Sequence, residues 1–242
     1  MHWLIFREPV NAWTHGVWAV AALPGCLLLW RVCRGDRVKQ WSLLLFGVTL
    51  ALCFGGSALY HGVRLPASQI EICRMIDHIG IFLLIGGTVT PAALVLLDGR
   101  WQLATLVFVW SMAIFGIFSL LVWPTVPPWL YTLQYVLTGW GACLGYFEMA
   151  RSLPARALRP VWLGGLLYTI GAMMNLAEWP VLVPGVFGSH ELWHVFGMAG
   201  SFCHFWFMLR WVARFDRRQA VPAGAIAVPS STPALAQVAT AP

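Results

Sequence analysis

Residues 41–62 read WSLLLFGVTLALCFGGSALYHG, an apolar stretch without Asp, Glu, Lys or Arg. A helix needs about 20 such residues to cross the hydrocarbon core of a bilayer. The stretch lacks the alternation of apolar and polar residues that marks a strand of a membrane barrel, so it predicts a helix. Further apolar stretches occupy 12–33, 76–97, 101–123, 128–150, 160–182 and 190–212. The sequence therefore predicts an all-α integral membrane protein, a bundle of seven transmembrane helices.

The composition excludes a soluble domain. Of the 242 residues, 60% are hydrophobic and 10% are charged, whereas a soluble domain carries about 25% charged residues. The formal net charge is +6, and 14 of the 15 basic residues are Arg, most of them in or beside the short connectors between apolar stretches. Because these residues form no basic stripe, anionic lipid headgroups explain the charge better than nucleic acid does. We expect membrane lipid, and not nucleic acid, as the partner.

The chain divides into three segments. Residues 1–11 form a short N-terminal segment, and residues 12–214 form the predicted membrane domain. Residues 215–242 are rich in Ala and Pro, a composition that cannot build a core, so this tail is expected to be disordered. The six cysteines form no C-x-x-C pair, and free thiols are expected.

Basic residues flank the two ends of the predicted bundle unequally. An odd number of spans puts the chain termini on opposite sides of the membrane. Three basic residues, Arg7, Arg64 and Arg74, flank the N-terminal side, and the other twelve of the 15 flank the opposite side. Lys and Arg are enriched on the cytoplasmic side of membrane proteins. This bias predicts an N-terminus outside the cell and a C-terminus in the cytoplasm.

Polar residues within the predicted spans gather at the N-terminal side of the bundle. An ionisable group near the bilayer centre costs about 2.5–3.5 kcal/mol, so the groups that remain there are candidates for a site. Odd-numbered spans begin on this side and even-numbered spans end there, which brings polar residues from four stretches together. These residues are His15, Ser57, His61, Asp77, His78, His190, Glu191 and His194.

Three histidines in this group have the spacing of metal ligands. His190 and His194 are four residues apart, which places both imidazoles on one face of a helix. The pair suits zinc, whose nitrogen ligands lie about 2.0–2.1 Å from the metal. His61 offers a third nitrogen, and Ser57, one turn earlier, can orient a ligand or a water molecule. Asp77 is the candidate general base. Three protein ligands and a water are typical of a catalytic zinc site.

Each of these residues also has a structural interpretation, because a histidine in a membrane helix commonly forms interhelical hydrogen bonds. His204 lies about 20 Å deeper than His190 on the same helix, and we interpret it in this way. His78 is about 100° around its helix from Asp77, so it need not face the same site. Asn175 and Glu178 either line a cavity at the N-terminal side or extend to the membrane surface. We favour the second interpretation.

Four short motifs stand at the ends of the predicted helices. Residues 8–15, EPVNAWTH, have the form E-x-x-N-x-x-[ST]-H, and residues 57–61, SALYH, have the form S-x-x-x-H. Residues 77–91, DHIGIFLLIGGTVTP, and residues 190–194, HELWH, followed by His204 and Phe205, complete the set. In this order the motifs resemble those of the hemolysin III / progestin and adipoQ receptor family, in its bacterial branch, over about residues 6–212.

The resemblance implies a seven-helix fold that holds one zinc ion in a bacterial inner membrane. Its ligands would be His61, His190 and His194, with Asp77 near the zinc-bound water and Ser57 beside the first ligand. The family is also distantly similar to alkaline ceramidases, membrane enzymes that hydrolyse a lipid amide. Animal adiponectin receptors place the N-terminus and the zinc on the cytoplasmic side, whereas the arginine count here favours the opposite face.

Three functions are compatible with these features. The first is a zinc-dependent intramembrane hydrolase of a lipid amide or ester, in which Asp77 and Ser57 serve the reaction. The second is a membrane receptor or sensor whose zinc is structural and contributes to folding. A pore-forming, hemolysin-like protein is least favoured, because conduction requires a polar stripe through the bilayer. Lys39, the only lysine, lies in a connector, which excludes a retinal Schiff base. A coupled transporter is not favoured, because no chain of ionisable residues crosses the midplane.

Overall fold

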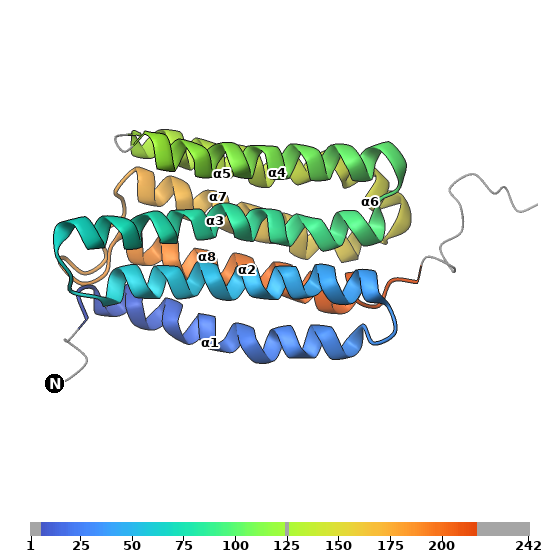
Figure 1. Ribbon diagram of the computed structural model, residues 1–242, viewed down its shortest axis with the longest axis horizontal. Helices are drawn as coiled ribbons and strands as arrows, with labels where there is room; N and C mark the ends of the chain where they lie inside the picture. The colour runs from blue at the N-terminus through green and yellow to red at the C-terminus, as the bar shows by residue number, and fades with distance from the viewer. Residues whose placement is uncertain (1–5, 124–125, 217–242) are drawn as a thin grey trace, which may run out of the picture.

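Long helices run side by side along the long axis of the molecule (Figure 1). This computed structural model describes residues 6–123 and 126–216. The elements in chain order are α1 (Pro9–Val32), α2 (Arg37–Gly62), α3 (Ala67–Leu96), α4 (Gly99–Val122), α5 (Pro128–Trp140), the 3₁₀ segment η2 (Gly141–Gly145), α6 (Tyr146–Ser152), α7 (Ala155–Leu176), α8 (Ser189–Phe207) and the π-helical segment η3 (Met208–Val212).

These elements form the predicted bundle of seven transmembrane segments. Helices α1 to α4 are each long and apolar enough to cross a membrane by length and composition. The fifth segment is α5, η2 and α6 taken together, the sixth is α7, and the seventh is α8 continued by η3. Helix α2 packs between α1 and α3, and α7 packs against α8. The prediction of an all-α membrane bundle is confirmed.

The outer surface of the bundle is apolar. Val20, Leu103 and Ile114 are 67%, 64% and 63% exposed. A continuous surface of this kind is unfavourable in water and is matched by the acyl chains of a bilayer. The interior is apolar as well, with Phe46 and Phe82 fully buried. The chain is therefore a multi-pass membrane protein.

Two helix ends differ from the sequence expectation. Helix α3 begins at Ala67 instead of 76, because Pro66 starts a first turn in which the Gln69 amide donates to the Pro66 carbonyl at 2.9 Å. Residues 67–75, which precede the third apolar stretch, thus form a polar extension of α3. Helix α7 ends at Leu176 instead of 182, and Glu178 shortly after it has a positive φ of 51°, which cannot continue a right-handed helix.

The fifth segment is interrupted where the sequence predicts one continuous helix. Glycine is a weak helix former, and Gly141 and Gly145 bound the 3₁₀ segment. A Cβ atom on Gly141 would collide with the Phe108 ring, and one on Gly145 would collide with Leu97. Close packing against neighbouring helices therefore requires glycine here, and the same glycines loosen the helix.

The turn between α1 and α2 is fastened to the end of the seventh segment. The Asp36 carboxylate caps α2 by accepting from the Lys39 amide at 3.1 Å. The Lys39 ammonium donates to the Phe215 carbonyl at 2.5 Å.

All six cysteines are free thiols, as expected. Residues 217–242, which make up most of the predicted disordered tail, lie outside the described residues.

Candidate metal centre

Three histidines from two helices meet at the N-terminal end of the bundle, where α1 begins and α2 ends. His61 lies in the last turn of α2, and His190 and His194 lie in the first turns of α8. One ring nitrogen of each lies within 4.8 Å of those of the other two. His61 and His194 are each only 2% exposed. The structure thus brings together the three candidate metal ligands, which we call the histidine cluster.

The spacing of one pair in the histidine cluster fits a tetrahedral metal ion. The Nε2 atoms of His61 and His190 are 3.5 Å apart. Two nitrogens that bind one tetrahedral zinc ion at about 2.05 Å lie about 3.3 Å from each other. Imidazole nitrogen is also a preferred zinc ligand. Both the donor set and its spacing therefore suit zinc.

Hydrogen bonds on the outer side of two rings leave the inner nitrogens free to bind a cation. Nδ1 of His61 donates to Oε2 of Glu8 at 2.5 Å, and Nδ1 of His190 donates to Oδ1 of Asn175 at 3.0 Å. A neutral imidazole carries a single N–H, so both Nε2 atoms then present lone pairs. Two lone pairs that face each other at 3.5 Å repel unless a cation lies between them. This pattern favours a metal site over a simple hydrogen-bonded pair.

Glu8, just before α1, is the charged partner of His61. Burial opposes ionisation of this carboxyl, but the hydrogen bonds that it accepts from His61 and Asn11 favour the ionised form, and the pKa of Glu8 is lowered. A carboxylate on the outer nitrogen of a histidine holds the ring in place and strengthens the inner nitrogen as a ligand. Glu8 therefore holds the His61 ring with its Nε2 atom toward the rest of the cluster.

His194 is held by ring packing. His15 of α1 stacks on it, with the ring centroids 3.7 Å apart and the planes 19° from parallel. The edge of the His15 ring in turn meets Phe54 of α2, at a centroid distance of 4.6 Å. Within the described residues, both nitrogens of His15 and Nδ1 of His194 are buried without a hydrogen-bond partner. His15 thus sets the plane of the His194 ring through stacking.

Asp77 and Ser57 lie together beside the histidine cluster. Helices α2 and α3 approach closely at Gly56, where an added Cβ atom would lie 3.7 Å from the Asp77 Cα. The Ser57 side chain is a hydrogen-bond partner of the Asp77 carboxylate, and Ser57 is 3% exposed. Asp77 is not among the groups whose ligand atoms meet within 4.8 Å in the described residues. Asp77 therefore lies near the histidine cluster but outside the group of candidate ligands.

An elongated cavity of about 450 Å³ connects the histidine cluster with the interior of the bundle. His194 and Asp77 line it at the N-terminal end, and Phe207 and Met208 line it near the opposite end. Ligand pockets in proteins commonly have volumes of about 300–1,000 Å³. The cavity is large enough to hold a small molecule or an extended hydrocarbon chain.

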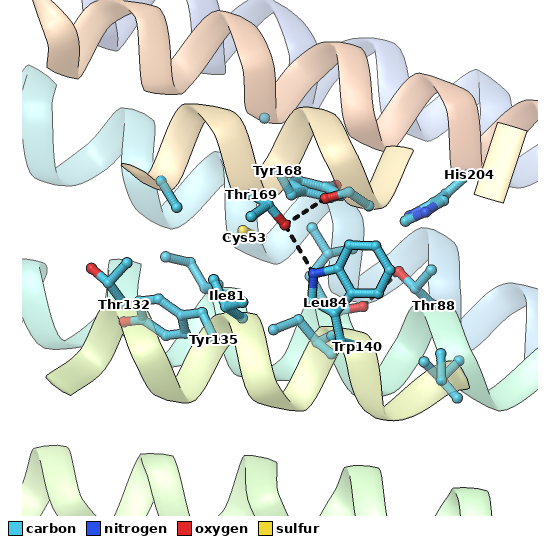
Figure 2. A pocket seen from close by; sticks show the side chains of 18 of the residues that line it. Cys53, Ile81, Leu84, Thr88, Thr132, Tyr135, Trp140, Tyr168, Thr169 and His204 are labelled. Atoms are coloured by element: carbon cyan, nitrogen blue, oxygen red, sulfur yellow. Dashed lines mark hydrogen bonds between the residues drawn. The ribbon is translucent and has the colours of Figure 1, made fainter. Parts of the chain in front are cut away.

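Polar groups in the middle of the cavity are already paired with the protein (Figure 2). Nε1 of Trp140 donates to the Thr169 hydroxyl at 3.0 Å, and that hydroxyl donates to the Gly165 carbonyl at 2.8 Å. Thr88 donates to the Leu84 carbonyl at 2.7 Å. Because these donors are satisfied, the middle of the cavity offers an occupant mainly apolar contacts.

Comparison with known proteins shows the family. The family model described as haemolysin-III related matches residues 3–205. The chain belongs to the haemolysin-III related family. The Hemolysin-3 homolog of Bacillus subtilis (strain 168) is 30% identical over 207 residues, which cover 85% of this chain and 94% of that protein. The Hemolysin-3 of Bacillus cereus is 29% identical over 208 residues, which cover 85% of this chain and 92% of that protein.

The haemolysin-III match includes the whole histidine cluster and also His78 and His204. His78 faces the cavity and bonds Tyr135, with Nδ1 2.7 Å from the phenol oxygen. Nε2 of His204 lies 3.4 Å from the Val161 carbonyl of α7, which agrees with an interhelical hydrogen bond. His204 also lines the cavity (Figure 2). It lies about 15 Å along α8 from His194, the nearest member of the cluster on that helix.

Sequence reasoning missed two polar partners of the histidine cluster, Asn175 and Glu8. Asn175 lines the cavity and bonds His190, so the interpretation that it extends to the membrane surface is wrong. The pattern of apolar residues in the sequence does not identify Asn175 as a site residue. Its contact with His190 depends on the loop that joins α7 to α8. Glu178 is exposed, as that interpretation requires. For Glu8 and His15 the signal was present in the motif of residues 8–15.

Proposed function

We propose that the histidine cluster binds a zinc ion and that the protein hydrolyses a lipid amide or ester at the N-terminal end of its cavity. The observation that carries this proposal is that His190 and His194 line the same cavity as Asp77 and Ser57. Three histidine ligands leave the fourth position of a tetrahedral ion open. The cavity adjoins that position and continues into a mainly apolar interior, which suits a lipid chain.

The residues divide the work of hydrolysis. A bound zinc ion would lower the pKa of a coordinated water toward about 7 and polarise the substrate carbonyl. Asp77 takes a proton from the attacking water and gives it to the leaving nitrogen or oxygen as the C–N or C–O bond breaks. Ser57 holds the Asp77 carboxylate in position through their hydrogen bond.

A receptor or sensor with a structural zinc is the second candidate. The burial of His61 and His194, each 2% exposed, favours it, since closed structural sites are shielded from solvent. In this case zinc contributes to the stability of the fold without taking part in a reaction. A pore is not favoured, although the relatives carry the name hemolysin, because the polar groups gather at one end of the bundle.

Turnover of defined lipids by the purified, zinc-loaded protein tests the proposal. The substrates are a long-chain lipid amide and a matched lipid ester, and the variants are Asp77→Asn and His194→Ala. We expect Asp77→Asn to keep its zinc and to lose turnover by about 10²–10⁴-fold, the usual contribution of a general base. We expect His194→Ala to lose both zinc and turnover. Glu148→Gln, whose carboxylate pairs with Arg151 away from the cavity, is the matched control and retains both.

The same experiment separates the two candidates. Equal turnover by the wild type, Asp77→Asn and His194→Ala would reject the hydrolase. If chelation then lowers the melting temperature of the wild type, with no turnover to lose, zinc is structural.

We also infer that the protein lies in a bacterial inner membrane with the histidine cluster toward the outside. The arginine bias and the bacterial sources of both relatives support this placement. In intact cells, a thiol reagent that cannot cross membranes should label Leu65→Cys in the exposed turn between α2 and α3. Labelling only after lysis would reverse the orientation.

A further inference from the structure

The ligands of the histidine cluster come from two helices whose relative position must be held. His61 ends α2, whereas His190 and His194 begin α8. Helix α1 contacts both α2 and α8. The beginning of α1 is therefore positioned to hold the two halves of the cluster at a fixed spacing.

On the α2 side, Glu8 is fixed to His61 twice. Its backbone amide donates to the His61 carbonyl at 2.9 Å, and its carboxylate accepts from the His61 ring at 2.5 Å. The neighbouring Arg7 amide donates to the Gly62 carbonyl at 3.3 Å, and its guanidinium lies over the Tyr60 ring at 4.3 Å. The carboxylate of Glu8 therefore moves with the last turn of α2.

On the α8 side, Glu191 is fixed to the start of the helix. It lies between the two ligands of α8, and its Oε2 accepts from the Gly188 amide at 2.7 Å. A carboxylate that bonds a free amide at a helix N-terminus caps the helix and interacts favourably with its dipole. The carboxylate of Glu191 therefore moves with the first turn of α8.

Asn11 joins these two carboxylates. Its Nδ2 donates to Oε2 of Glu8 at 3.2 Å and to Oε1 of Glu191 at 2.9 Å. Asn11 is 1% exposed, so water does not compete for these bonds. One amide nitrogen carries two protons, and here one proton serves each half of the cluster.

We propose that Asn11 is a positioning residue that sets the spacing of the histidine cluster through Glu8 and Glu191. The inference rests on the zinc site of the proposed function, but it does not depend on the reaction. Asparagine meets the requirement because it is neutral and offers two donors from one atom. Aspartate at this position would place three carboxylates together with no proton to share. Loss of Asn11 leaves every zinc ligand in place and removes only the link between them.

The zinc affinity of the purified full-length protein, measured by competition with a chelator, tests this role. Partners of metal ligands typically contribute 10–100-fold in affinity. We expect Asn11→Leu to weaken zinc binding by about that factor, and Asn11→Asp, which keeps the shape and loses the donors, to weaken it at least as much. Asn11→Gln retains the amide and should recover part of the affinity. In the cobalt-substituted protein, the visible spectrum of Asn11→Leu should differ from that of the wild type, because the ligand geometry is no longer held.

Trp18→Phe is the matched control. Nε1 of Trp18 donates to the Ser201 hydroxyl at 2.8 Å, which is another side-chain hydrogen bond between α1 and α8, about two turns deeper than Asn11. We expect this variant to keep the zinc affinity and the cobalt spectrum of the wild type. Equal losses in Trp18→Phe and Asn11→Leu would overturn the inference, because general packing of α1 on α8 would then explain them.

Two other outcomes are also decisive. Wild-type affinity in both Asn11→Leu and Asn11→Asp would overturn the role of Asn11 and leave the zinc proposal intact. A wild-type protein that binds no zinc would overturn both proposals. Loss of turnover in Asp77→Asn alone bears only on the reaction, so the two failures are distinguishable.

Discussion

The two ends of the bundle bury different kinds of residue. At the N-terminal end, Asn11, Ser57, His61 and His194 are each at most 3% exposed. Near the opposite end, most of the deeply buried side chains are apolar, although Thr105 is also 1% exposed. The apolar side chains include Leu29, Leu43, Leu97, Met208 and Val212, each at most 1% exposed. Burying polar groups costs free energy unless each finds a partner, so the N-terminal end is arranged for a site and the opposite end for packing.

Charge is handled differently at the two ends as well. At the opposite end, arginines remain outside the apolar core and lie over tryptophan rings, with Arg210 over Trp206 at 5.4 Å and Arg156 over Trp211 at 5.9 Å. At the N-terminal end, the carboxylate of Glu8 turns inward to a buried histidine. A charged group that faces the interior of a membrane protein indicates a functional site, whereas charged groups that face outward fit the membrane interface. If this division is correct, mutations at the two ends should affect different properties.

The largest effect is expected from the loss of a ligand in the histidine cluster. His190→Ala removes one of three imidazoles and leaves a cation with too few nitrogens to compete with water. We expect the zinc content to fall from one per chain to less than about a tenth of that value, as measured by elemental analysis of the purified protein.

His204→Ala is the control for this prediction, because it removes a histidine from the same helix and the same cavity, far from the cluster. It should retain its zinc. A His190→Ala protein with full zinc content would show that the cluster is not the metal site.

The second prediction concerns the packed core. Phe46 of α2 is fully buried and lies about 22 Å along the helix from the histidine cluster. Phe46→Ala should reduce the free energy of unfolding by about 3–5 kcal/mol through lost contacts and the cavity left behind, as measured by equilibrium unfolding in mixed micelles. The zinc content of the folded protein should not change.

Phe118→Ala is the matched control for Phe46→Ala. Phe118 is 55% exposed on the outer surface, where lipid or detergent replaces its contacts, so the loss of stability should be smaller. Loss of zinc from folded Phe46→Ala would break the division between the two ends.

Much of this architecture could be predicted from sequence because a segment that crosses lipid must be long and apolar. Every membrane-crossing segment must satisfy its backbone internally and present apolar side chains, so each leaves a long apolar stretch. The apolar stretches do not define where each helix begins and ends. The early start of α3 at Ala67 and the break at Gly141 depend on a local turn and on packing against Phe108. Neither is visible in hydropathy.

The candidate site shows the same limit. The ligands were predictable, because the spacing of His190 and His194 is local and the order of spans brings His61 to the same end. The groups that hold the ligands were not. Asn175 meets His190 only because the loop after α7 returns the chain to the cavity, and Glu8 meets His61 only because the chain before α1 lies along the end of α2. Such contacts follow from the tertiary structure.

The smallest of the three effects is expected at Asn175. It sharpens the comparison because it separates the orientation of the His190 ring from the stability of the fold at the N-terminal end. The side-chain Oδ1 of Asn175 accepts from Nδ1 of His190 at 3.0 Å, a neutral hydrogen bond that fixes the ring and leaves its Nε2 toward the cluster. Asn175→Ala should weaken zinc binding by about 10-fold, the lower end of the range for partners of metal ligands. It should change the free energy of unfolding of the metal-free protein by only about 0.5–1.5 kcal/mol, the net contribution of one hydrogen bond.

Asn175→Asp keeps an acceptor for Nδ1 and should bind zinc at least as well as the wild type, as measured by competition with a chelator. Equal weakening in both variants would mean that the Asn175 amide acts through its other contacts. The ring of His190 would then be oriented by its neighbours in the cluster.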